Sequence, residues 1–246
     1  MSDTNSSNRA LVIQERVFLT CAAIFIASLV ACNLIFQKFF HWTLSVRLFD
    51  WTLFSYTFEL SVGILPYPIT FLVTDIVSEI YGKRRADQIV VSGFIASFFV
   101  MLIVLLAQAA PQTSWSPVSN EEFSKVFGLY GPAVFASMTA YLLAQFIDIR
   151  VFHFWKRLTQ GRHLWLRNNG STIFSQLIDT LTVILILCIA GVIEWERMPD
   201  LVLSGFIFKM GIAILDTPFF YLANWGLREL MHLGPLEEIS AQKSLA

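Results

Sequence analysis

Six long apolar segments constrain the fold of this chain more than any other sequence feature. A helix needs about 20 mostly apolar residues to cross a hydrocarbon layer roughly 30 Å thick. The segments run over residues 17–40, 64–81, 86–110, 131–155, 171–193 and 201–225. Composition agrees, because only 14% of the residues are charged, against about 25% in soluble domains. We therefore predict an all-α membrane protein with six transmembrane helices.

The second segment does not fit a simple helix. Residues 52–81 form one apolar stretch that Pro66-Tyr67-Pro68 interrupts. An unbroken helix of this length would span about 45 Å, more than the membrane requires. Proline removes a backbone N–H and clashes with the preceding turn, so we expect a break near these prolines. Residues 64–81 then cross the membrane, and residues 51–63 form an outer-side or re-entrant segment.

Lysine and arginine residues predict the orientation. If both termini are cytosolic, the inner segments hold Arg9, Arg16, Lys83, Arg84, Arg85, Lys156, Arg157, Arg162, Arg167, Arg228 and Lys243, and the outer ones hold Lys38, Arg47, Lys125 and Arg197. This excess follows the positive-inside rule. We expect a disordered cytosolic leader (residues 1–16, without a signal-peptide pattern), one membrane domain (17–230) and a cytosolic tail (231–246). The membrane would be the bacterial inner membrane.

Several functional classes receive no support from the sequence. The net charge of −1 and the lack of a basic cluster give no reason to expect nucleic-acid binding. Cys21, Cys32 and Cys188 lie in apolar runs without CxxC spacing, so neither disulfides nor a zinc site are indicated. We expect no metal, no cofactor and no catalytic residues. An intramembrane aspartyl hydrolase would need two carboxylates sharing a proton, and its YD and GxGD motifs are missing from the sequence.

Polar residues inside the apolar segments are the candidate functional residues. An ionisable side chain at membrane depth is costly and is by default a candidate for a transport path or a buried pair. Spacings of three, four or seven residues place two side chains on one helix face. Such pairs are Asn33 with Gln37, Asp75 with Glu79, Gln145 with Asp148, Gln176 with Asp179, and Lys209 with Asp216. The four aspartates lie at similar depths, roughly 9 to 14 Å from the predicted cytosolic helix ends.

Structural roles for these residues stay open. Asp75 and Glu79 could cap helix ends or pair with Lys83 and Arg84, and Lys209 could neutralise Asp216. The glutamine–aspartate pairs could form interhelical hydrogen bonds, and Asn33 could be a buried packing amide. Small residues at helical spacing, namely Ala23, Ala27 and Ala31 in one segment and Gly93 with Ser97 in another, permit close helix approach. That approach can occur within one chain or in a homo-oligomer.

Three motifs carry a resemblance to a known family. They are Pro68-Ile-Thr-Phe-Leu-Val-Thr74-Asp75-Ile-Val-Ser78-Glu79-Ile-Tyr81-Gly82-Lys83 followed by Ala86, Arg167-Asn-Asn-Gly170-Ser171, and Ser175-Gln176-Leu-Ile-Asp179-Thr180. The pattern resembles the signature of the queuosine precursor transporter family, also called the vitamin uptake transporter family. The resemblance extends from the first predicted helix to the last. Ser78 stands where the family usually has asparagine.

The resemblance implies a six-helix protein that imports 7-deazaguanine precursors of queuosine, such as 7-cyano-7-deazaguanine or queuine. It also implies a fold similar to the substrate-binding components of energy-coupling-factor (ECF) vitamin importers. An alternative is therefore a substrate-capture subunit of a multi-component ATP-driven importer. The chain has no GxxxxGK[ST] phosphate loop of its own.

The chemistry of a deazaguanine matches the polar residues. A carboxylate can accept the ring N–H and amino donors, and an amide can serve the carbonyl or the pyrrole edge. We predict a site between the second, fourth, fifth and sixth helices. The candidate substrate-binding residues are Asn33, Asp75, Glu79, Gln145, Asp148, Gln176, Asp179, Lys209 and Asp216.

Overall fold

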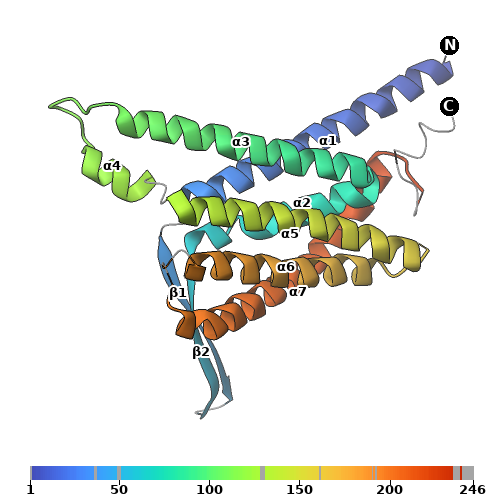
Figure 1. Ribbon diagram of the computed structural model, residues 1–246. Helices are drawn as coiled ribbons and strands as arrows, with labels where there is room; N and C mark the ends of the chain where they lie inside the picture. Colours follow the sequence, from blue (N-terminus) through green and yellow to red (C-terminus); the bar gives the residue numbers. More distant parts are fainter. Residues whose placement is uncertain are drawn as a thin grey trace.

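The computed structural model is a bundle of long helices with a β-hairpin at one end (Figure 1). It describes residues 2–35, 38–48, 51–127, 131–160, 162–189, 191, 193–234 and 239. The elements are α1 (Ser2–Ile35), β1 (Phe39–Leu48), β2 (Trp51–Ser61), η1 (Val62–Ile64), α2 (Tyr67–Ile80), α3 (Lys83–Ala109), α4 (Asn120–Phe127), α5 (Gly131–Leu158), α6 (Leu164–Ile189), η2 (Trp195–Arg197) and α7 (Met198–Leu230).

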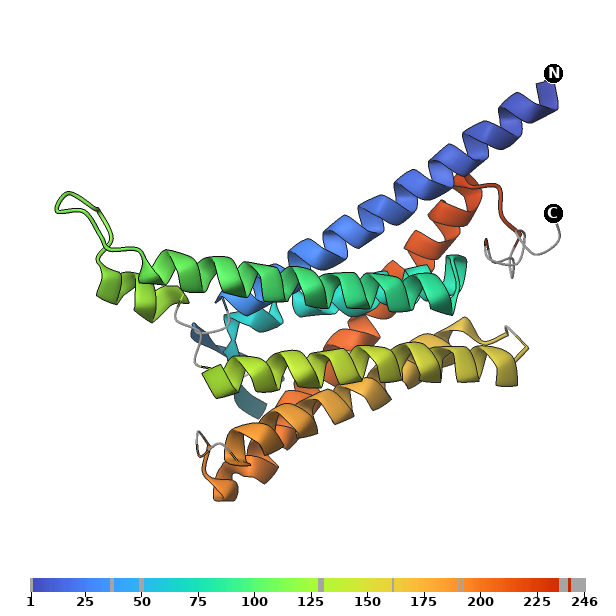
Figure 2. The same ribbon diagram turned by 45° about the horizontal axis from the view of Figure 1, so that its top comes forward.

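Six of these helices run back and forth along the bundle. Figures 1 and 2 show that α1, α2, α3, α5, α6 and α7 alternate in direction, so α7 ends where α1 begins. The short helix α4 lies beyond the other end. We call the end that holds Lys83, Lys156, Arg167 and Arg228 the basic end, and the opposite one the hairpin end. The alternation brings together the basic residues that the sequence assigns to the cytosol.

Five stretches of the described residues are long and apolar enough to cross a membrane. They are Leu11–Ile35, Val62–Ile80, Lys83–Ala109, Leu164–Ile189 and Trp195–Leu230. The fold is therefore that of a multi-pass membrane protein. Helix α5 is not among the five. Its 28 residues would span about 42 Å, which is long enough to cross a membrane. The sixth crossing, by α5, stays a prediction.

The N-terminal helix begins much earlier than predicted. Helix α1 runs from Ser2 to Ile35, so it includes residues 2–16 and ends before residue 40. Nothing in residues 2–16 breaks a helix, since the segment holds neither proline nor glycine. The Tyr81 hydroxyl donates to the Gln14 carbonyl at 2.7 Å, which fastens this part of α1 to the end of α2. Gln37 lies outside the described residues.

Besides its helices, the chain has a β-hairpin that the prediction of an all-α membrane protein did not include. Strands β1 and β2 pair antiparallel, with Phe39 opposite Ser61 and Trp42 opposite Phe58. Residues 41–48 alternate polar and apolar side chains and include β-branched residues, which is typical of a strand. A search for long apolar helices does not detect this alternation of polar and apolar residues. Segment 51–63, predicted as outer-side or re-entrant, is therefore β2 followed by η1.

The proline break is confirmed, and it places α2 at the centre of the bundle. Helix α2 begins at Tyr67 with Pro68 in its first turn, where a missing N–H costs nothing. It packs against α1, α3, α5 and α7. Every residue from Thr70 to Ile80 except Leu72 is buried. The polar side chains of α2 therefore face protein rather than lipid.

Close packing of α1 on α3 depends on Gly93. A Cβ added there would lie 2.5 Å from Cε1 of the fully buried Phe25 and 3.0 Å from Cδ2 of Leu29. We expect Gly93→Ala to destabilise the protein by about 1–3 kcal/mol through overpacking. Gly211→Ala, where nothing lies within 4 Å, is the matched control. Thermal unfolding of the detergent-purified variants tests this, and equal midpoints for the two would contradict it.

Candidate functional site

Helix α2 carries polar side chains at three levels along its length. Tyr67 lies nearest the hairpin end, Thr74 and Asp75 lie two turns further on, and Glu79 lies one turn beyond Asp75. Side chains of α5 and α6 contact each of these levels, and side chains of α7 contact Tyr67 and Glu79. The interior of the bundle is thus polar at three successive levels.

At the basic end, three cations surround one carboxylate; we call Glu79, Lys156, Arg167 and Arg228 the Glu79 cluster. Oε1 of Glu79 accepts from Arg167 at 2.7 Å and from Arg228 at 3.0 Å, and Lys156 lies 3.1 Å from Oε2. The Glu79 side chain is fully buried. The ion-pair interpretation of Glu79 is confirmed, but its partners are not Lys83 and Arg84. The cluster joins α2, α5, α6 and α7.

At the middle level, two aspartates face each other. Asp75 of α2 and Asp148 of α5 interact through their side chains, and both are buried. Thr172 donates to Oδ2 of Asp75 at 3.2 Å, and Ser175 donates to Oδ1 of Asp148 at 2.9 Å. Both hydroxyls come from α6, so this group joins three helices.

Gln145 lies one turn from Asp148 on α5 and is fully buried. It accepts from Thr74 of α2 at 3.2 Å and donates to the Tyr141 hydroxyl at 2.8 Å. Gln145 therefore acts as an interhelical contact in this conformation, the structural alternative that the sequence left open.

Nearer the hairpin end, Lys209 of α7 forms an ion pair with Asp179 of α6. The Tyr67 hydroxyl donates to the same carboxylate at 2.7 Å, and the Lys209 ammonium lies 4.8 Å from the Tyr67 ring centroid. The sequence proposed Asp216 as the partner of Lys209, because both lie on one side of α7. The structure instead pairs Lys209 with the neighbouring helix.

A small cavity lies beside these groups, between α2, α6 and α7. Its polar lining residues are Thr172, Gln176, Lys209 and Asp216, and its apolar lining comes from residues that include Phe71 and Phe208. Its volume of about 20 Å³ accommodates a single water molecule. A planar bicyclic ligand would enter only if side chains or helices move.

Phe208 connects this cavity to the β-hairpin. Its ring lies 6.0 Å from that of Trp42 and 5.7 Å from that of Phe58, centroid to centroid, while Phe208 itself lines the cavity. Trp42 and Phe58 also stack on each other at 5.8 Å. The Phe208 ring therefore joins the cavity wall to the two aromatic side chains of the hairpin.

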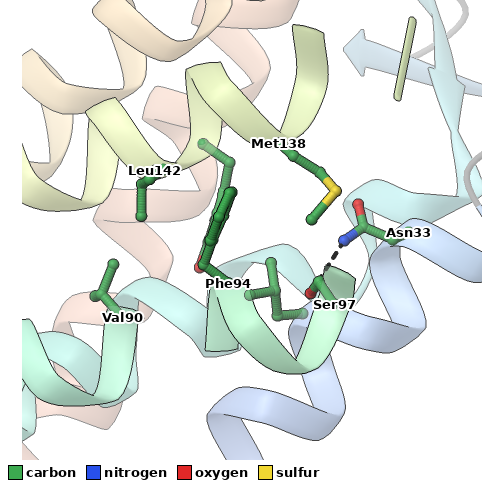
Figure 3. A pocket seen from close by; sticks show the side chains of 8 residues that line it. Asn33, Val90, Phe94, Ser97, Met138 and Leu142 are labelled. Atoms are coloured by element: carbon green, nitrogen blue, oxygen red, sulfur yellow. Dashed lines mark hydrogen bonds between the residues drawn. The ribbon is translucent and has the colours of Figure 1, made fainter. Parts of the chain in front are cut away.

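Asn33 is separated from the other predicted site residues. Its amide donates to the Ser97 hydroxyl at 3.4 Å across α1 and α3 (Figure 3). Both residues line a narrow pocket between α1, α3 and α5, together with Val90, Phe94 and Met138. The packing-amide interpretation fits Asn33 better than a place in the polar interior.

A family model described as "Putative vitamin uptake transporter" matches residues 61–223, from the end of β2 to α7. The chain belongs to this family, the queuosine precursor transporters. The matched part contains every predicted site residue except Asn33. It ends before Arg228 of the Glu79 cluster.

Three curated relatives of the family resemble the chain over most of its length. The "Probable queuosine precursor transporter" of Bacillus subtilis is 30% identical over 168 residues, 67% of this chain and 71% of the relative. The "Queuosine precursor transporter" of Escherichia coli is 29% identical over 200 residues, 76% of this chain and 81% of the relative. The Haemophilus influenzae protein, named as probable, is 26% identical over 186 residues, 73% and 75%. No solved structure matches the chain.

Several residues of the site were not predicted from the sequence. Tyr67 belongs to the predicted proline break and Thr172 is of a residue type common in membrane helices, so neither residue indicates a role from the sequence alone. Arg167 and Ser175 lie within the family motifs, which is the signal that could have found them. Arg228 shows only as one basic residue near a helix end.

Proposed function

We propose that this protein imports queuosine precursors of the 7-deazaguanine type, such as 7-cyano-7-deazaguanine or queuine, into the cytosol. Family membership supports a transport function rather than an enzymatic one. The names of the relatives support queuosine precursors as the cargo. The cargo would enter at the hairpin end and leave at the basic end, with both termini in the cytosol.

One observation carries the proposal. Oδ1 of Asp75, Oδ2 of Asp148 and Oε1 of Gln176 are buried and have no hydrogen-bond partner among the described residues. Buried polar atoms in native proteins are nearly always paired. Three unpaired acceptors between α2, α5 and α6 suit a ligand rich in donors. The ring N–H and exocyclic amino groups of a deazaguanine are such donors.

Aromatic side chains beside these acceptors could hold the faces of the ring. Tyr67, Phe71 and Phe208 line the cavity that Gln176 also lines. Planar rings favour offset stacking or edge contacts with such side chains. A site of this kind rejects analogues that lack the matching donors, because its own acceptors would remain unpaired.

The test is uptake in cells that can neither make queuosine precursors nor import them. Expressing this chain and supplying each precursor in turn should restore queuosine in tRNA for at least one deazaguanine. Protein present in the membrane without any restored queuosine would refute the proposal. Uptake by the purified protein alone in liposomes would exclude the ATP-driven capture subunit, which nothing in the comparisons favours.

Gln176→Leu should slow uptake strongly. Leucine keeps the side-chain size but leaves a donor of the bound ring unpaired, at a cost of about 1–3 kcal/mol. At limiting substrate the rate should fall roughly 5- to 150-fold. The matched control is Gln88→Leu on the exposed face of α3, which should match the wild type. Equal uptake by both variants at equal expression would remove Gln176 from the site.

A further inference from the structure

A wide groove lies between α1 and α3, away from the polar interior of the bundle. Its volume is about 920 Å³, near the upper end of the roughly 300–1,000 Å³ that small-molecule sites occupy. One wall includes Phe18, Leu19 and Ala22 of α1, and the other is formed by α3 within residues 83–92. Leu19 and Val91, one from each wall, are 62% and 43% exposed. The groove is therefore open on the outside of the bundle.

The groove has the shape of a wedge that closes at Gly93. Figures 1 and 2 show that α1 and α3 diverge toward the basic end. At Gly93 the two helices are in contact, because an added Cβ would lie 2.5 Å from Cε1 of Phe25. On α3 the lining runs from Lys83 to Ser92, all before Gly93. The wedge thus narrows over nine steps of α3, about 14 Å at helical rise.

The mouth of the wedge carries unbalanced positive charge. Lys83 forms an ion pair with Asp87, and Arg85 reaches Glu15 of α1 at 2.9 Å. Arg84 lines the groove, is exposed, and forms no ion pair with any described residue. The first turn of α3 holds these three cations and no acidic residue. Since the N-terminal end of a helix dipole is also positive, an anion at the mouth would be stabilised.

Cations at the mouth and apolar side chains further in match the two parts of a phospholipid. Helix α3 is a candidate membrane span that begins at Lys83, so Arg84 lies at the level of lipid headgroups. Val91 lies about 10 Å deeper along the helix, where it faces Ala22 and Ile26 across the groove. Basic pockets between transmembrane helices bind anionic headgroups. A zwitterionic headgroup brings its own ammonium, which Arg84 would repel.

We propose that this groove is a binding site for an anionic phospholipid, with the phosphate at Arg84 and an acyl chain between Ala22 and Val91. The identity of the cargo plays no part in this assignment. The lipid fills the space where α1 and α3 diverge, so it bridges the two helices beyond their contact at Gly93. A ligand that binds only the folded state stabilises it, and the bound lipid therefore stabilises the bundle.

Native mass spectrometry of delipidated protein tests the role of charge. The probes are dioleoylphosphatidylglycerol, which is anionic, and dioleoylphosphatidylcholine, which is zwitterionic. The wild type should retain the anionic lipid in preference. Arg84→Gln should weaken its retention about fivefold, the effect of one cation near an anionic headgroup. The matched control is Arg162→Gln, an exposed cation between α5 and α6 at the same end, which should change retention by less than about twofold.

Thermal unfolding in detergent tests the apolar part of the groove. Ala22→Phe places a ring where the acyl chain would lie, while Ala23→Phe adds the same ring at an exposed position of α1 outside the lining. Dioleoylphosphatidylglycerol should raise the unfolding midpoint of the wild type and of Ala23→Phe, but not that of Ala22→Phe. If Ala22→Phe does not fold, the comparison of Arg84→Gln with Arg162→Gln decides alone.

Three results would overturn the assignment. The wild type could retain both lipids equally, which would remove the selectivity for negative charge. Arg84→Gln and Arg162→Gln could lose equal amounts of lipid, which would indicate general attraction to a basic surface. A lipid-free dimer that Ala22→Phe dissociates would give the groove to a second copy of the chain.

Discussion

Replacing Glu79 with glutamine should leave little folded protein in the membrane. The substitution keeps the shape of the side chain but removes a negative charge that contacts Lys156, Arg167 and Arg228 together. Arg167 and Arg228 are 1% and 7% exposed, so their charges would remain inside the protein. Removing one partner of a buried ion pair costs about 3–5 kcal/mol. We expect Glu79→Gln to lower the free energy of unfolding by at least that amount.

The matched control is Glu15→Gln. Glu15 pairs with Arg85 at 2.9 Å, but both side chains are substantially exposed, and such pairs contribute about 0–1 kcal/mol. Thermal unfolding of detergent-purified protein and the yield of folded protein measure both effects. Equal stability of the two variants would mean that the Glu79 cluster does not hold the basic end together.

The Glu79 cluster also has a consequence for transport. It joins α2, α5, α6 and α7, the helices that carry the unpaired acceptors and the cavity. Cargo that leaves at the basic end must pass between these helices. Release to the cytosol therefore requires these ion pairs to open or rearrange, which makes the cluster a barrier on the cytosolic side of the proposed path.

The sequence correctly predicts which side chains lie on the same face of a single helix. Asp75 and Glu79, four residues apart, do lie on one buried face of α2, and Gln176 does face the interior. Helical spacing is a local property, so it can be read without knowing the fold. The proline break before α2 follows from proline chemistry for the same reason.

Partners between helices could not be predicted in this way. Glu79 contacts residues 77, 88 and 149 positions away rather than its neighbours Lys83 and Arg84. Lys209 reaches Asp179 instead of Asp216. Which faces meet depends on helix packing and rotation, and neither spacing nor hydropathy contains this information. The hairpin was missed for a different reason, because a window of 20 residues averages over the alternation of a strand.

Lys209→Met should abolish uptake by removing the only cation of the described residues that forms an ion pair with Asp179. The Tyr67 hydroxyl still donates to this carboxylate, but one neutral donor does not balance a charge with a 5% exposed side chain. We expect a loss of about 3–5 kcal/mol in the free energy of unfolding. Lys125→Met, at the exposed ion pair with Glu121 on α4, is the matched control and should cost less than about 1 kcal/mol.

Adding Asp179→Asn to Lys209→Met separates a structural role from a substrate contact. The double variant has no buried charge left at this position, and the Tyr67 hydroxyl can still donate to the asparagine oxygen. Stability and uptake should both recover, because Asp179 is already occupied by Lys209 and Tyr67 while the unpaired acceptors lie on Asp75, Asp148 and Gln176. A stable double variant without uptake would instead place Asp179 or Lys209 in contact with the cargo, and would move the proposed site one turn toward the hairpin.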